Sequence, residues 1–165
     1  IHDSVFFQKR IHFESLLQFP VLPLWHFKYN DNLDLCKSTA KHLKYSELVC
    51  EKLQDNPVNT LGFKLNDKWF GCFGAQCLIS RRFLARIQLK YNLFSLTQVI
   101  KTRPMRCSLE RIIGILFHLE FPQLSAIHSL LGNIWNYGKW GYTYEEYTKN
   151  HIYKHLPIVK VWTGR

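Results

Sequence analysis

The spacing of apolar residues alternates along this chain between patterns typical of strands and patterns typical of helices. It therefore predicts alternating strands and helices. Runs rich in β-branched and aromatic residues are typical of strands and occur at residues 1–7, 23–29 and 156–162. A Gly-interrupted apolar run over residues 67–80 adds a further strand pattern. Near the end, Thr143 and Glu146 match a capping box, which predicts that a helix begins there. The alternation favours a mixed α/β fold in which a mixed sheet is flanked by helices.

Helical spacing of apolar residues predicts one helix over about 32–54, broken near Tyr45 and Ser46. Asn30 or Asp31 is placed to cap it. A second helix follows Ser80, whose hydroxyl is a suitable N-cap.

A long helix is expected in the segment CSLERIIGILFHLEF, with Ser108 as its N-cap. A shorter helix over residues 95–103 should end before Pro104, because the residue preceding a proline disfavours helical dihedrals. These boundaries put Glu110 in the first turn of the long helix. The helix dipole favours a carboxylate at that position.

Composition describes a well-packed protein with a basic surface. The 165 residues are 47% hydrophobic and 15% aromatic, enough for one domain or for the C-terminal part of a larger catalytic domain. The first residue is Ile1, not Met, so we expect a longer parent chain. No apolar stretch reaches the roughly 20 residues of a transmembrane helix. The net charge of +10 suits anionic partners, but the bases are spread evenly, so no specific nucleic-acid binding is expected.

Five cysteines stand at positions 36, 50, 72, 77 and 107, an odd number with no CxxC pair. A structural zinc site or a complete disulfide framework is therefore not expected. We interpret most of them as small buried side chains in a reducing compartment such as the cytoplasm. A bridge between Cys36 and Cys50 is the alternative.

Three stretches have residue types suited to chemistry. Asp3, beside an apolar strand, is either the ligand of a divalent cation that bridges phosphates or a cap of the next turn. The run WFGCFG at residues 69–74 is either a loop that lets backbone and aromatic faces approach a ligand or a tight bend in a strand. Glu110 is either a general base or a partner of the helix dipole. Arg111 beside it is either a phosphate clamp or a surface residue.

The histidines divide by their surroundings. His26 and His118 lie in apolar runs and are interpreted as structural residues with satisfied hydrogen bonds. His128 is surrounded by small and polar residues, and we regard it as a candidate metal ligand.

Taken in order, IHDS, WFGCFGAQCLISRRFLARI and SLERIIGILF resemble the second half of a GT-A type nucleotide-sugar glycosyltransferase. The acidic metal-binding motif of that superfamily is matched by the single carboxylate of Asp3. The acidic pair that opens its catalytic helix is matched by Glu110 and Arg111. The ends WGYTYEEY and LPIVKVWTGR resemble glycosyltransferase-like proteins of bacteria and large DNA viruses.

This resemblance implies an inverting transfer of a sugar from a nucleotide-sugar to a saccharide or other hydroxyl acceptor. It implies Glu110 as the base and Mn²⁺ or Mg²⁺ bound by Asp3. Basic residues that would meet the diphosphate are Lys160 and Arg165. Residues that would shape the acceptor site are Trp69, Gly71, Phe73, Gly74 and Arg111.

Two further hypotheses follow from the sequence, one about function and one about association. A non-catalytic glycosyltransferase-like module, with a binding or structural role such as that of a viral particle component, would also fit the single-aspartate motif. Separately, a sheet without its first strands would leave an unpaired edge. At that edge we expect a missing N-terminal segment or a second copy of the chain.

Overall fold

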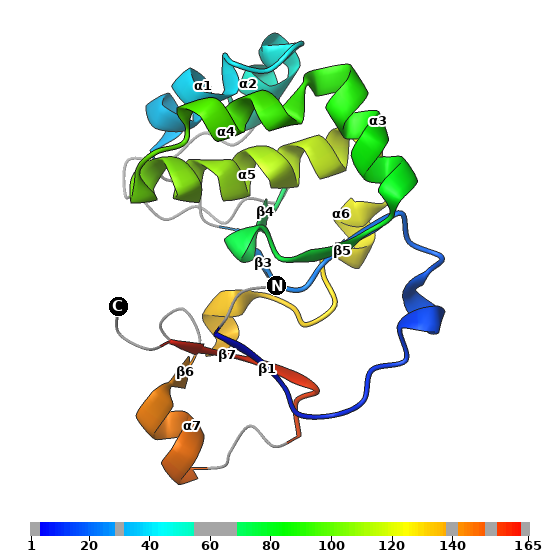
Figure 1. Ribbon diagram of the computed structural model, residues 1–165, viewed down its shortest axis with the longest axis vertical. Coiled ribbons are helices and arrows are strands. Elements are labelled where there is room, and N and C mark those ends of the chain that lie inside the picture. Colours follow the sequence, from blue (N-terminus) through cyan, green and yellow to red (C-terminus); the bar gives the residue numbers. More distant parts are fainter. Residues whose placement is uncertain (1–3, 29–31, 55–68, 138–141, 151–154, 163–165) are drawn as a thin grey trace.

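The computed structural model describes residues 4–28, 32–54, 69–137, 142–150 and 155–162, and it confirms a mixed α/β fold. Figure 1 shows most of the helices at one end of the molecule and a three-stranded sheet with a short helix at the other. Two pairs of short strands lie between these ends. The candidate site is built where the helices meet those strand pairs.

The first predicted helix is two helices, α1 (Leu33–Ala40) and α2 (Ser46–Gln54). The predicted break is confirmed, since Tyr45 has a left-handed φ of 54° that a continuous helix cannot contain. The N-cap of α1 is Asn32, whose side chain makes no capping hydrogen bond. Asn30 and Asp31 lie outside the described residues.

Helix α3 (Arg81–Tyr91) begins as predicted after Ser80, whose hydroxyl accepts a hydrogen bond from the Phe83 backbone N–H at 3.2 Å. A 3-10 turn (Leu93–Ser95) and the short helix α4 (Leu96–Val99) follow it. At the far end of the chain, the capping box is confirmed at the start of α7 (Tyr144–Asn150). Glu146 accepts from the Thr143 N–H at 2.8 Å, and the Thr143 hydroxyl accepts from the Glu146 N–H at 3.2 Å.

The long helix α5 (Arg103–Glu120) begins earlier than the sequence predicts. Thr102 is its N-cap and accepts from the Met105 N–H at 3.4 Å, and Pro104 lies in the first turn. A proline is tolerated there because the first N–H groups of a helix have no intrahelical acceptor. The predicted start at Ser108 is therefore wrong, and Glu110 lies in the body of the helix instead of its first turn.

The strands form three small sheets in the described residues, where one mixed sheet was expected. Strand β2 (Val21–Pro23) pairs antiparallel with β5 (Cys77–Ile79), and β3 (His26–Phe27) pairs antiparallel with β4 (Gly71–Cys72). In the third sheet, β7 (Ile158–Trp162) lies between antiparallel β1 (Val5–Phe7) and parallel β6 (Tyr142–Thr143). Each strand pair extends over only two or three residues, so no long sheet develops from these segments.

The main core lies between α5 and the elements around it, namely α1, α2 and β4. Ile112, Ile115 and Leu116 of α5 are fully buried in it. A second cluster around Leu24 and Trp25 connects the strand pairs to the three-stranded sheet through Ile158. The short α6 (Leu124–Ile127) follows α5 and adds the buried Leu124 to the main core.

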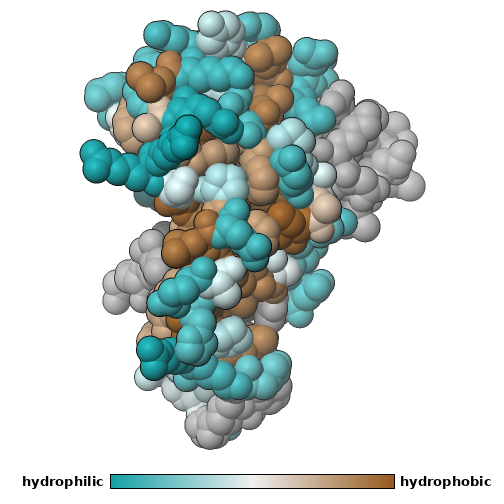
Figure 2. Space-filling view, turned by 90° about the vertical axis from the view of Figure 1, so that its right-hand side faces the viewer, coloured by the Kyte–Doolittle hydropathy of each residue, from teal (hydrophilic) through white to brown (hydrophobic). Residues whose placement is uncertain are grey.

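Ion pairs join the C-terminal end of α5 to α3. The Glu120 carboxylate lies 2.7 Å from Lys90 Nζ and 3.2 Å from Arg86 Nε, and the Tyr91 hydroxyl donates to it at 2.7 Å. Figure 2 shows apolar side chains in a band across the middle of one face, between more polar ends. Among the described helices, none has the length and hydropathy needed to span a membrane.

Gly114 sets the distance between α5 and β4. A Cβ at this position would lie 2.0 Å from the Phe70 carbonyl oxygen and 3.0 Å from Gly71 Cα, and both are backbone atoms that cannot rotate away. In an open helix Gly→Ala stabilises by about 1 kcal/mol. Here we expect Gly114→Ala to lower the free energy of unfolding by about 2 kcal/mol or more, because overpacking forces the helix away from the strand. Urea denaturation measures the change.

The matched control is Ser38→Ala on the exposed side of α1. This substitution also introduces alanine into a helix, but without a close backbone neighbour. It should leave stability within about 0.5 kcal/mol of wild type. A Gly114→Ala protein as stable as the Ser38→Ala protein would contradict the close approach of α5 and β4.

Candidate functional site

One face of α5 lies against β3 and β4 and presents its polar side chains there. The Arg111 guanidinium lies 4.9 Å from the centre of the Phe27 ring, a cation–π arrangement. One turn further, Gly114 meets the Phe70 backbone, and after another turn His118 Nε2 accepts the Phe70 N–H at 3.1 Å. The i, i+3, i+7 spacing of these residues places them in one row along the helix.

Glu110 precedes this row by one residue and is half-buried, and its helix packs against the 3-10 turn that joins β4 to β5. A hydrogen bond with the Cys77 thiol, burial and the negative charge of Glu110 raise the pKa of Cys72 well above its usual value. The same hydrogen bond lowers the pKa of Cys77. The negative charge of Glu110 therefore acts on Cys72, the last residue of β4 before the turn to β5.

The turn itself is the 3-10 helix Phe73–Ala75 between β4 and β5. Gly71 is required before it, because the Phe27 ring lies 2.0 Å from where a Cβ would be. Gly74 has a left-handed φ of 61° and is half-exposed, as is Phe73. Trp69, also predicted to shape an acceptor site, is instead fully buried in the main core.

Gln76, at the end of this turn, was not identified from the sequence. Its side chain is 3% exposed, yet neither its amide nitrogen nor its amide oxygen has a hydrogen-bond partner among the described residues. A buried polar group without a partner costs about 1–3 kcal/mol. The available signal was a single amide inside the otherwise apolar run GAQCLI.

Of the remaining predicted residues, Arg111 and Lys160 lie in the described part of the chain and two lie outside it. Arg111 is buried, and its Nη1 donates to the Cys107 carbonyl at 2.8 Å. The interpretation of Arg111 as a surface residue is therefore wrong. Lys160 lies on β7 opposite Val5, and its Nζ donates to the Ser4 hydroxyl at 2.5 Å. Asp3 and Arg165 lie outside the described residues.

Three histidines surround Phe70, the residue before β4, and they come from β3, from α5 and from the C-cap of α6. The Phe70 ring centre lies 4.4 Å from that of His128, 5.1 Å from that of His26 and 5.3 Å from that of His118. His26 Nδ1 is also 2.7 Å from the Ser129 hydroxyl. His26 and His118 are buried and hydrogen-bonded, which confirms their structural interpretation.

The predicted metal ligand His128 packs against aromatic rings. Within the described ranges, no three His, Cys, Asp or Glu side chains gather in a way that could hold a metal ion. A cation site that includes Asp3 thus stays a prediction. The cysteines are free thiols, and Cys36 and Cys50 form no bridge.

Burial and nearby positive charge act on two of the histidines. Burial, followed by the charges of His128, Lys28 and His118, lowers the pKa of His26 from 6.5 to about 4. Burial, followed by Lys52 and His128, lowers the pKa of His118 from 6.5 to about 4. Protonation of His118 Nε2 would also remove the acceptor of the Phe70 N–H.

We therefore expect acid to destabilise the protein between pH 6.5 and about 4. In that range the unfolded chain binds protons at these two positions and the folded protein does not, so stability falls as pH falls. Each histidine contributes at most about 1.4 kcal/mol per pH unit. Urea denaturation from pH 7.5 to 4.5 measures the slope.

His118→Gln should flatten this slope, because it removes one of the two titrating groups. The exposed His12→Gln serves as the control and should leave the slope unchanged. Equal slopes for the His118→Gln protein and the wild type would contradict the assignment.

No protein-family model, curated protein or solved structure matches this chain. Its function therefore has to be inferred from the contacts of the site. Those contacts bring α5, the helix that contains Glu110, against the β4–β5 turn, which contains Phe73 and Gly74 and is followed by the buried amide of Gln76.

Proposed function

We propose that this chain is the acceptor-side part of an inverting GT-A type glycosyltransferase domain. The observation that supports the proposal most directly is the packing of α5, the helix that contains Glu110, against the β4–β5 turn. These are the two stretches in which the base and the acceptor site are expected, and they are distant in sequence. Helix α5 packs against both β4 and the turn, so a rigid element positions the carboxylate.

In this proposal Glu110 accepts the proton of an acceptor hydroxyl while the hydroxyl oxygen attacks the anomeric carbon of the donor sugar. The bond from that carbon to the nucleoside diphosphate breaks as the new glycosidic bond forms. Half-burial suits a base, because water does not fully solvate the carboxylate. Phe73 and the backbone around Gly74 form the acceptor side of the site.

The donor side of the proposal rests on residues at the chain ends. Asp3 would hold Mn²⁺ or Mg²⁺, which when bound neutralises charge on the leaving diphosphate. Lys160 and Arg165 are the proposed diphosphate contacts. The bond from Lys160 to Ser4 places a cation beside the residue that follows Asp3 in sequence.

A non-catalytic module is the second candidate. The observation that favours it is the packing of Trp69 and Arg111, two predicted site residues that are buried against the core and the Phe27 ring. Such a module would keep the fold for binding or assembly and would have no transferase activity.

Nucleotide binding separates the two candidates. We expect UDP, GDP or dTDP to bind the wild-type protein in the presence of Mn²⁺, and we expect Asp3→Ala to abolish that binding. Calorimetric titration measures the affinity with and without the metal. If none of the three nucleotides binds the folded protein, the transferase proposal is wrong and the non-catalytic module is favoured.

Glu110→Gln tests the catalytic base. Once a donor and an acceptor are known, this substitution should lower kcat by about 10²–10⁴-fold, the usual contribution of a positioned base, with nucleotide affinity unchanged. Glu47→Gln, on the exposed surface of α2, is the matched control and should keep full activity. A Glu110→Gln enzyme with wild-type kcat would assign the base to another residue.

A further inference from the structure

The side chain of Gln76 is buried but has unused hydrogen-bonding capacity. Its backbone is satisfied, since its N–H donates to the Phe73 carbonyl at 3.1 Å and its carbonyl accepts the Leu24 N–H at 2.8 Å. Its carboxamide has two donor hydrogens and an acceptor oxygen, and none of them is paired within the described chain. The conclusion does not depend on which amide atom is nitrogen, because both lack a partner.

Gln88 shows what a satisfied glutamine in this protein looks like. Its Nε2 donates to the Asn92 side chain at 3.2 Å, and its Oε1 accepts the Phe94 N–H at 2.8 Å. Gln88 is half-buried, whereas Gln76 is more buried and makes neither kind of bond. Buried amides are normally hydrogen-bonded. For the amide of Gln76 we therefore expect a hydrogen-bond partner that is not part of the described chain.

The turn over Gln76 is built so that it could admit such a partner. A Cβ on Gly74 would lie 2.7 Å from Gln76 Nε2, so the backbone of this half-exposed glycine packs directly against the amide. Ala75 has a left-handed φ of 53°, which is unfavourable for a residue with a side chain. If the turn rearranges when a partner binds, the strain at Ala75 is relieved and the amide of Gln76 becomes paired.

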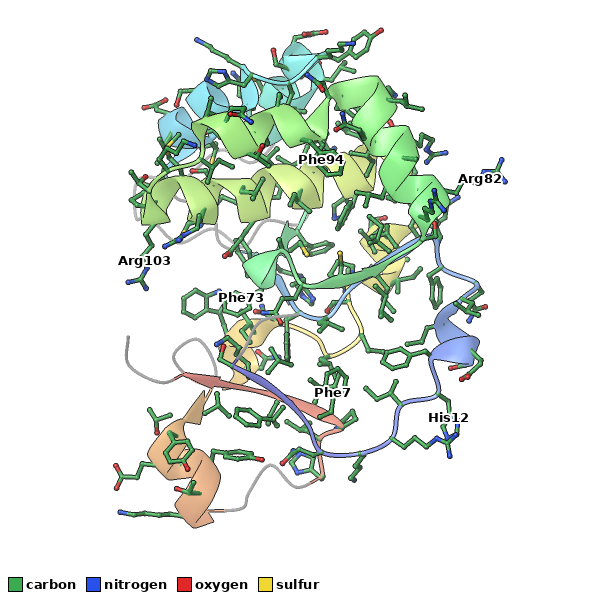
Figure 3. All side chains as sticks on the ribbon, viewed as in Figure 1. Phe7, His12, Phe73, Arg82, Phe94 and Arg103 are labelled. Atoms are coloured by element: carbon green, nitrogen blue, oxygen red, sulfur yellow. The ribbon has the colours of Figure 1, made fainter. Side chains whose placement is uncertain are left out.

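The surroundings favour a neutral, hydroxyl-rich partner. Phe73 belongs to the same turn, and Figure 3 shows it between the helices and the three-stranded sheet. A sugar ring suits this combination of residue types, because its C–H face stacks on an aromatic ring while its hydroxyls both donate to and accept from a carboxamide. The negative charge of Glu110, which acts on Cys72 before the turn, disfavours an anion, and a hydroxyl is the group that Glu110 would deprotonate.

We propose that Gln76 is the acceptor-recognition residue, and that its carboxamide binds the hydroxyls of a saccharide after the Phe73–Ala75 turn moves aside. One hydroxyl donates to Oε1 and another accepts from Nε2. This inference rests on the proposed function and assigns its acceptor class as a neutral saccharide.

The test uses Gln76→Met, which keeps the shape of the side chain and removes both polar ends. Without ligand, the variant should melt above wild type by a few °C, because it no longer buries an unsatisfied amide. Gln88→Met is the matched control and should melt below wild type, because it leaves the Phe94 N–H without its acceptor.

Saccharide binding is then measured without nucleotide or metal, by saturation-transfer NMR with methyl glycosides of glucose, galactose, mannose and N-acetylglucosamine. We expect at least one to bind wild type and the Gln88→Met protein, and its affinity for Gln76→Met to fall at least tenfold. The saccharide measurement needs no donor nucleotide, so saccharides can bind even if nucleotides do not. The role of Gln76 and the transferase function can therefore be disproved independently.

Two results would overturn the inference. A Gln76→Met protein that melts below wild type would mean that the amide is already satisfied in solution. Absence of binding by all four glycosides to wild type, or equal binding to wild type and Gln76→Met, would mean that Gln76 does not recognise a saccharide.

Discussion

The close approach of α5 to β4 is the contact on which the rest of this structure depends. Gly114 has no side chain, so the helix comes within reach of the Phe70 carbonyl and of Gly71. At that distance the neighbouring turns of the helix act directly on the strand, since Arg111 reaches the Phe27 ring and His118 accepts the Phe70 N–H. A wider spacing would break both contacts and would move Glu110 away from the β4–β5 turn.

This packing also explains why the polar groups near β4 have such different roles. Arg111 and His118 are used by the fold, because each has a partner in the strand pair. Glu110 precedes Arg111 by one residue and remains half-buried. Gln76 is buried by the turn that follows β4, but the turn offers its amide no partner. An unsatisfied amide is a cost to stability that binding a ligand would remove, and functional sites often carry such costs.

The elements that the sequence predicts well are those with local causes. Ser80 and the pair Thr143 and Glu146 cap their helices as expected, because a cap depends on residues three positions apart. The break after α1 was also visible locally. The start of α5 was not, because Pro104 is compatible both with ending one helix and with the first turn of the next. Because Pro104 lies in the first turn of α5, Glu110 lies in the interior of the helix and not at its N-terminus, where it was expected.

The sequence by itself determined that the chain is a mixed α/β protein with a basic surface, free thiols and structural roles for His26 and His118, because composition and short-range spacing govern these properties. Only the tertiary structure decided which polar residues are used for packing and which are left over. Trp69 and Arg111 looked like ligand contacts and became part of the interior, whereas Gln76 looked like an ordinary polar residue and its buried amide has no partner among the described residues. The physical reason is that a hydrogen-bond partner or a ring face comes from another part of the chain, and local sequence does not specify which one.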